Sequence, residues 1–243
     1  MDVVDLREFY ASLLGKATRR IIANKLSSGL GADVEARIMG LGYAAPYIGA
    51  QVNSFAFMMA RRGVTHWPEE GLVRSVLVDE LDLPLTENAV EVALLVHGLE
   101  FTDSPEELLE EIWRVLTPQG RLLVVVPNRR SLWALSDASP FGHGQPFSRG
   151  QLLGLLRAAQ FSVTRVDHAL FVPPLERVAG WRVARIFERN SANLFNRFSG
   201  VFVVEATKQV YAYAAGRKFK RLGSRVRPLL LPTPHFHQHP TQR

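Results

Sequence analysis

Short apolar runs alternate with amphipathic stretches along the chain, and this alternation predicts strands and helices in turn. Apolar residues recur at a helical period across residues 4–26, and the Ser-Ser-Gly-Leu-Gly stretch at 27–31 is expected to end that helix. The shorter apolar runs predict buried strands. These runs lie at 37–39, 55–59, 75–78, 90–96, 122–126, 161–166 and 200–206.

Further helices are expected between these strands. The clearest begins at Ser104, where a Ser-Pro-Glu-Glu sequence supplies an N-cap, a proline suited to the first turn and two acids beside the positive helix end. Pro46 is expected to begin another, and two more are predicted at 148–159 and 175–189. Strands that alternate with helices predict an α/β fold, Rossmann-like and doubly wound, around a mostly parallel sheet.

The composition is that of an ordinary globular protein. Of the 243 residues, 47% are hydrophobic and 21% are charged, and none is cysteine. The lack of cysteine excludes disulfides, zinc–thiolate centres, iron–sulfur clusters and thiol nucleophiles. No apolar run is long enough to cross a membrane, and the first residues lack the pattern of a secretory signal. We therefore expect a soluble, cytoplasmic protein.

The positive net charge of +6 is concentrated at the C-terminal end. Residues 206–243 hold eight of the 29 basic residues and none of the 23 acidic ones, so residues 1–205 carry a net charge of −2. A nucleic-acid-binding body is disfavoured. We expect one domain over 1–205, divided at 34 and 130, followed by a flexible basic tail. The tail is either a solvated terminus, which we favour, or a weak contact for nucleic acid or an anionic membrane.

Two glycines come directly after the first predicted strand. Gly40 and Gly42 precede Tyr43, where the strand is expected to turn. Glycines at such a turn let the backbone approach a ligand, and ligands of these sheets bind beyond the carboxyl ends of the strands. Glycine also serves turns that bind nothing. Neither a complete dinucleotide pattern nor a phosphate loop is present, so the turn alone leaves both possibilities open.

Five segments, in order, resemble the class I S-adenosylmethionine-dependent methyltransferases, specifically the type 11 methyltransferase domain. They are Ile38–Ala44, Asp79–Leu85, Val90–Glu100, Glu110–Val124 and Phe147–Phe161. The resemblance implies an S-adenosylmethionine cofactor. It also implies that the methionine end lies on Gly40, Gly42 and Tyr43, the adenine on Asp79 and Glu80, and the sulfonium near His97.

The chain departs from the family pattern at three places. Ile38 stands where an acid is expected, and Ala44 where a third glycine is expected. The segment between the glycine turn and Asp79 is short, and its strand ends in Arg61-Arg62 without an acid for the ribose hydroxyls. Trp67 is expected either to cover the adenine or, as we favour, to pack at the sheet edge.

The candidate chemistry follows the fourth predicted strand. Methyl transfer depends mainly on alignment, and it needs a base only if the acceptor must lose a proton. His97 is the candidate base, and Glu100 is expected to orient it or to bind substrate. A histidine bonded to a loop carbonyl and a capping glutamate are the structural alternatives. The segment Asn128–Arg130 is either a site for an anionic acceptor or a solvated turn.

The interpretation that these features favour is an S-adenosylmethionine-dependent methyltransferase that acts on a small-molecule acceptor. The alternative is a catalytically degenerate protein of the same fold that binds or regulates, which the missing acids and the short second-strand region favour. A third class, binding of nucleic acid or membrane through the tail, would show affinity that falls steeply with salt. No metal site is expected, and the oligomeric state is left open.

Overall fold

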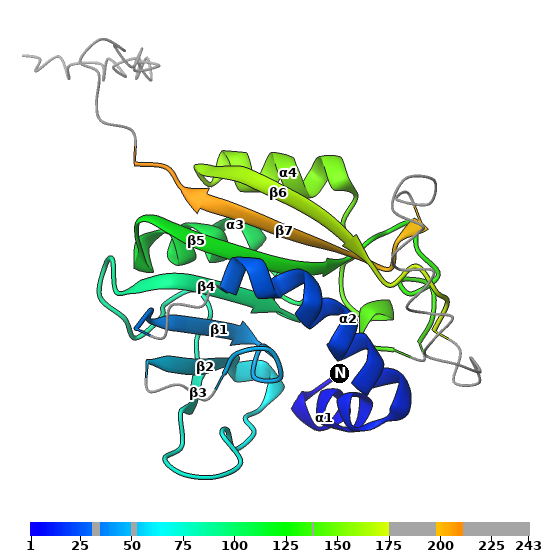
Figure 1. Ribbon diagram of the computed structural model, residues 1–243. Helices are drawn as coiled ribbons and strands as arrows, with labels where there is room; N and C mark the ends of the chain where they lie inside the picture. Colours follow the sequence, from blue (N-terminus) through cyan, green and yellow to red (C-terminus); the bar gives the residue numbers. More distant parts are fainter. Residues whose placement is uncertain (31–34, 50–52, 138, 175–197, 211–243) are drawn as a thin grey trace, which may run out of the picture. The chain divides into compact units, whose positions relative to one another are not determined.

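The computed structural model describes residues 1–30, 35–49, 53–137, 139–174 and 198–210 (Figure 1). A seven-stranded sheet has the order β3-β2-β1-β4-β5-β7-β6. The five strands β1 to β5 are parallel to their neighbours in the sheet. Strand β7 runs antiparallel to both β5 and β6. The mostly parallel α/β sheet is thereby confirmed. The strands are β1 Ile38–Gly42, β2 Ser54–Met59, β3 Ser75–Val78, β4 Val90–Val96, β5 Leu116–Pro127, β6 Phe161–Ala169 and β7 Val201–Lys208.

Helices cover both faces of this sheet, with α2 on one face and α3 and α4 on the other (Figure 1). Successive strand residues point to opposite faces. Thus Leu95 of β4 packs in the cluster that contains α3 and α4, whereas Leu94 and Val96 pack in the cluster that contains α1 and α2. The helices are α1 Val3–Ala11, α2 Leu13–Leu30, α3 Pro105–Val115 and α4 Arg149–Ala158. No helix in the described part of the chain is long and apolar enough to span a membrane.

The N-terminal helix differs from the prediction. The single helix expected over 4–26 is broken at Ser12 into α1 and α2, and α2 continues through residues 27–29. Gly15 permits the sharp joint, because a Cβ there would lie 1.9 Å from the Phe9 carbonyl oxygen. Gly29 does not end the helix. A Cβ at that position would lie 2.5 Å from a methyl carbon of Leu123, so this glycine allows close packing on β5.

The connections within the β1–β3 half of the sheet contain less helix than the sequence predicts. The helix expected from Pro46 is wrong: the chain makes a turn there, with the amides of Tyr47 and Ile48 both donating to the Ala44 carbonyl. These turn residues bury apolar side chains against α1 and α2, which cover this face instead. Between β2 and β3 the described helical structure is one 3-10 turn, η1, at Ala60–Arg62.

Most other predicted elements are confirmed with small shifts at their ends. The strands at 75–78 and 90–96 match β3 and β4, and the helix from Ser104 is α3. The strands predicted at 161–166 and 200–206 extend to residues 169 and 208. The helical stretch at 175–189 and tail residues 211–243 lie outside the described residues.

Lys208, which the charge pattern assigns to the tail, is instead a buried residue of β7. Its ammonium donates to Asn88 Oδ1 at 2.9 Å and to the Leu116 carbonyl at 2.6 Å, and it lies 4.0 Å from the centre of the Trp113 ring. Burial lowers the pKa of Lys208. This cation therefore fastens the end of β7 to the neighbouring strand rather than facing solvent.

A Glu–Arg pair on α3 holds the segment that follows β3. Arg114 donates to Glu111 and to the carbonyls of Leu83 and Leu85, while Glu111 accepts the Leu83 amide at 2.7 Å. The hydrogen bond from Arg114 lowers the pKa of Glu111. These two motif residues thus position the chain beyond Asp79, and their visible role is structural.

Candidate functional site

The glycine turn lies at the carboxyl ends of β1 and β4, and both glycines are required by packing. Gly42 has φ +83°, and a Cβ on it would lie 2.4 Å from the Val96 carbonyl oxygen. The same carbonyl accepts the Tyr43 amide at 2.6 Å. At Gly40 a Cβ would lie 2.7 Å from that of Ala44. The turn is therefore pressed against the end of β4, where His97 follows.

His97 and Glu100 form a buried pair directly after β4. His97 has φ +53°, a left-handed conformation that is strained for a side chain with a Cβ. Its Nδ1 lies 3.1 Å from Glu100 Oε1, and the two residues are 2% and 1% exposed. Glu100 Oε2 is buried without a hydrogen-bond partner in the described part of the chain. The structure thus brings the two candidate catalytic residues together.

Two tyrosines that the sequence analysis missed complete this network. The Tyr10 hydroxyl lies 2.9 Å from His97 Nε2, and the Tyr47 hydroxyl donates to Tyr10 at 2.9 Å. Burial raises the pKa of Tyr10 and of Tyr47. Both hydroxyls therefore keep their protons. The Tyr10 hydroxyl accepts from Tyr47 and keeps one proton that it can donate to Nε2, and in that tautomer Nδ1–H donates to Glu100.

This arrangement holds the imidazole between a phenol and a carboxyl group. Nε2, the nitrogen that would take a proton from an acceptor, is occupied by the Tyr10 hydroxyl. Tyr10 lies 87 positions before His97 and on the apolar face of its helix. Its sequence signal is that of a core residue, so nothing in the pattern could indicate this contact.

The described residues leave little space beside Gly42 and Tyr43 of the glycine turn. The cavity there measures about 10 Å³. Arg62 crosses its edge, donating to the Met1 carbonyl at 2.6 Å with its guanidinium 4.1 Å from the centre of the Phe101 ring. Helix α1 lies beyond the carboxyl ends of β1 and β2 (Figure 1). The lining residues are Val3, Leu6, Gly42, Tyr43, Met58, Met59, Arg62, Gly63, His97 and Phe101.

The other predicted cofactor residues lie apart from this cavity. Gly40 is inside β1, whereas Asp79 and Glu80 follow β3, two strands away. Asp79 is exposed, and its Oδ1 accepts the Leu81 amide at 3.0 Å, which closes a local turn. Trp67 is partly buried and packs against the α1–α2 side of the core, in line with the packing alternative.

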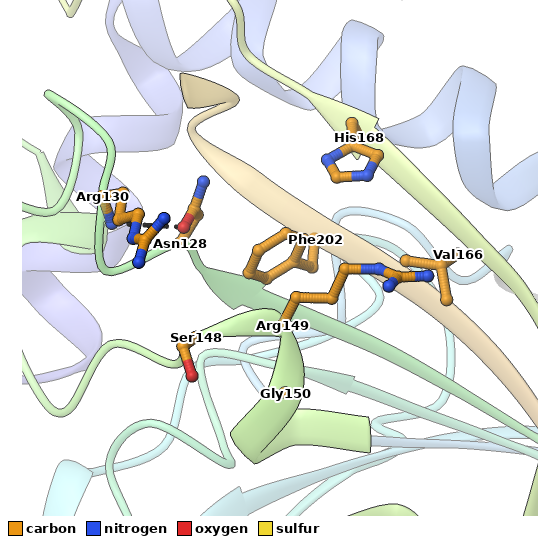
Figure 2. Close-up of a pocket in the computed structure, with 8 residues that line it drawn as sticks. All are labelled: Asn128, Arg130, Ser148, Arg149, Gly150, Val166, His168 and Phe202. Carbon is orange, nitrogen blue, oxygen red and sulfur yellow. Dashed lines mark hydrogen bonds between the residues drawn. The ribbon is translucent and has the colours of Figure 1, made fainter. Parts of the chain in front are cut away.

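A second cavity, of about 650 Å³, lies where β5, β6 and β7 meet the start of α4 (Figure 2). Asn128 and Arg130 come from the end of β5, and Arg149 from the first turn of α4. Figure 2 shows Arg130 and Arg149 on opposite sides of the Phe202 ring. The lining residues are Asn128, Arg130, Ser148, Arg149, Gly150, Val166, His168 and Phe202.

The three residues of the predicted anionic-acceptor site have different surroundings. Asn128 is buried, donates to the Ser199 carbonyl at 2.9 Å and accepts the Arg130 amide, so it shapes the turn. Arg129 donates to the Pro146 carbonyl at 3.2 Å. Of the three, Asn128 and Arg130 line the second cavity. An anionic-acceptor site at this segment stays a prediction.

The strand order, the antiparallel β7 and the glycine turn beside β4 define the fold of the class I methyltransferases. Residues 26–124 match the family model described as a methyltransferase domain. The predicted resemblance is confirmed.

Known proteins agree with this fold. A demethylmenaquinone methyltransferase from Paenarthrobacter aurescens (strain TC1) is 29% identical over 126 residues, which are 47% of this chain and 49% of that protein. The chain thus matches about half the length of this curated relative. A possible histamine N-methyltransferase from Thermotoga maritima superimposes with TM-score 0.60 and 20% identity over 85% of this chain and 96% of its own. An Archaeoglobus fulgidus SAM-dependent methyltransferase gives TM-score 0.55 and 16% identity over 78% and 94%.

The methyltransferase domain implies S-adenosylmethionine as its cofactor, and the glycine turn is where the resemblance expects it. Cavities that hold small-molecule ligands usually measure about 300–1,000 Å³. A cavity of about 10 Å³ is barely enough for one water molecule. Among the described residues, the cofactor therefore does not fit in this cavity, which Val3 and Leu6 of α1 and Arg62 line.

Proposed function

We propose that the protein is an S-adenosylmethionine-dependent methyltransferase that methylates a small-molecule acceptor. The observation that carries this proposal is the domain match over residues 26–124, together with the Gly42 turn pressed against the end of β4. Beside that turn stands a buried His97–Glu100 pair, which a purely structural strand end does not need. The cofactor has to enter after the space at the turn opens.

The roles of the site residues follow from their positions. Backbone groups at Gly40, Gly42 and Tyr43 would approach the methionine end of the cofactor, and Asp79 with Glu80 would meet the adenine. His97 is the proposed base: once Tyr10 leaves, Nε2 is free to accept a proton from the acceptor. Glu100 positions the ring by accepting Nδ1–H and offsets the charge that the ring then gains.

A small molecule is the acceptor class that the surface supports. The body of the chain carries a net charge of −2, which does not favour a polyanionic substrate. The second cavity, about 650 Å³ in volume, lies within the range for small-molecule ligands. Its lining contains two arginines and no carboxylate among the described residues.

The cofactor assignment is tested by calorimetric titration with S-adenosylhomocysteine. Asp79→Asn keeps an oxygen to accept the Leu81 amide but removes the charge that would meet the adenine amino group. We expect its affinity to fall about tenfold, the difference between a charged and a neutral acceptor. Asp82→Asn, a neighbouring exposed acid, is the matched control. Equal affinities for the two variants would remove Asp79 from the site.

A second function, a degenerate methyltransferase fold that binds or regulates, is favoured by Arg62. This arginine follows β2, where the family has an acid for the ribose, and it is bonded to the N-terminal residue instead. This alternative predicts that S-adenosylhomocysteine binds neither the full chain nor a variant in which α1 is released.

A further inference from the structure

The N-terminal helix fills the place that the domain family gives to the cofactor. Val3 and Leu6 of α1 line the cavity of about 10 Å³ opposite Gly42 and His97. Val3, Leu6 and Tyr10 form the buried face of this helix, whereas Val4 on its other face is 45% exposed. The apolar face of α1 thus closes the site.

The polar contacts of α1 are made with groups of the site itself. The Tyr10 hydroxyl lies 2.9 Å from His97 Nε2. The carbonyl of Met1, which precedes α1, accepts a hydrogen bond from the Arg62 guanidinium at 2.6 Å. Within the described part of the chain, the Arg62 guanidinium donates to the carbonyls of Met1 and Phe101. A carboxylate is a stronger partner for a guanidinium than a carbonyl. An anionic ligand would therefore compete for the group that α1 holds.

The short connection between α1 and α2 can serve as a hinge for α1. Ser12 separates α1 from α2 in extended backbone, with φ −67° and ψ 166°, and Gly15 lies just beyond it. The α1 helix has nine residues, too few to be stable in isolation, so its position depends on the apolar contacts with the site. A rotation at this joint would expose the glycine turn while α2 stays packed on the sheet.

We propose that α1 is an autoinhibitory plug, so that the protein binds S-adenosylmethionine only when α1 leaves the glycine turn. This inference rests on the proposed function, because it takes the glycine turn as the cofactor site. When the competent state is a small fraction of the population, the apparent affinity is reduced by that fraction. Displacing α1 should therefore strengthen cofactor binding, and fixing it should weaken binding.

The chain lacks cysteine, so a disulfide can fix α1 in the full-length protein. A Cβ on Gly63 would lie 3.2 Å from Val3 Cγ1, which is close enough for a bridge between Val3→Cys and Gly63→Cys. The single variant Gly63→Cys carries the same strain at φ +86° and is the matched control. Oxidised and reduced forms of the double variant have one sequence, so folding effects of the substitutions cancel between them.

The opposite perturbation is Leu6→Ser, which makes the buried face of α1 polar. Val4→Ser makes the same kind of change on the exposed face of the same helix and is its control. All proteins are titrated with S-adenosylhomocysteine by calorimetry. We expect Leu6→Ser to bind at least about tenfold tighter than Val4→Ser, and the oxidised double variant to bind at least about tenfold weaker than its reduced form.

The outcomes separate the plug from the proposed function. If the full chain binds S-adenosylhomocysteine and neither Leu6→Ser nor oxidation of the double variant changes the affinity, the plug is overturned and the cofactor site stands. If none of the proteins binds the ligand, including Leu6→Ser and the reduced double variant, the proposed function is overturned and the plug falls with it. Should the disulfide fail to form, the comparison of Leu6→Ser with Val4→Ser decides.

Discussion

Three tyrosines around His97 differ in the hydrogen bonds of their hydroxyls, which allows a graded test of the buried network. The Tyr10 hydroxyl is bonded to His97 Nε2 and to the Tyr47 hydroxyl, each at 2.9 Å. The Tyr47 hydroxyl takes part in one of these bonds. The Tyr43 ring stacks on that of Tyr10 at 5.5 Å, and its hydroxyl makes no hydrogen bond within the described part of the chain.

The expected losses in the free energy of unfolding follow from these counts. A hydrogen bond contributes about 0.5–1.5 kcal/mol net, and a buried group left unpaired costs about 1–3 kcal/mol. Tyr10→Phe removes two bonds and leaves His97 Nε2 buried without a donor, so we expect a loss of about 2–4 kcal/mol. Tyr47→Phe removes one bond and should cost about 1 kcal/mol. Tyr43→Phe should change stability by less than about 0.5 kcal/mol.

Urea unfolding followed by tryptophan fluorescence measures these differences, since the chain has four tryptophans. The dependence on urea should be the same for all three variants, because none changes the surface exposed on unfolding. The order Tyr10→Phe, then Tyr47→Phe, then Tyr43→Phe is the diagnostic result. Equal losses for Tyr10→Phe and Tyr43→Phe would refute the network, because these two differ only in their hydrogen bonds.

Three further outcomes follow from buried and partly buried polar groups. Arg114→Lys should lower the free energy of unfolding by about 1–2 kcal/mol, because one lysine ammonium cannot bond the carbonyls of Leu83 and Leu85 and the Glu111 carboxylate together. An unchanged urea midpoint would contradict this. Lys208→Met should cost about 1–3 kcal/mol in the same assay, since it leaves a buried carbonyl unpaired. Burial raises the pKa of Tyr10 and Tyr47, so the folded state keeps protons that the unfolded state releases above pH about 10. Stability should therefore be retained below that pH and fall above it, and phenolate absorbance from these tyrosines before unfolding would be the contrary result.

The sheet was predictable because buried parallel strands carry a simple signal. All of β4 except Glu91 is buried, and its apolar residues mark both its extent and its central place. The helix from Ser104 was equally clear, because proline, two acids and an apolar face agree with one another. Such local signals also located the glycine turn and His97 at the end of the neighbouring strands.

The N-terminal region was not predictable, because its structure is set by contacts distant in sequence. Gly29 suggests a helix end in the sequence, but in the structure it lets the side chain of Leu123 pack against the helix. Pro46 suggests a helix start, yet α1 and α2 already cover the face that such a helix would bury. Tyr10 has the sequence pattern of a core residue, and only its partner 87 positions later gives it a chemical role.

The state of the buried pair separates the enzyme from the degenerate alternative. A site that served only as a core for α1 would have no reason to keep His97 in a left-handed conformation or to leave Glu100 Oε2 buried without a partner. Both features reduce stability. Strained and incompletely paired groups concentrate at functional sites. These features support the proposed function, under which the network beneath α1 is a closed site, and the proposed plug accounts for a cofactor site and a filled cavity in the same place.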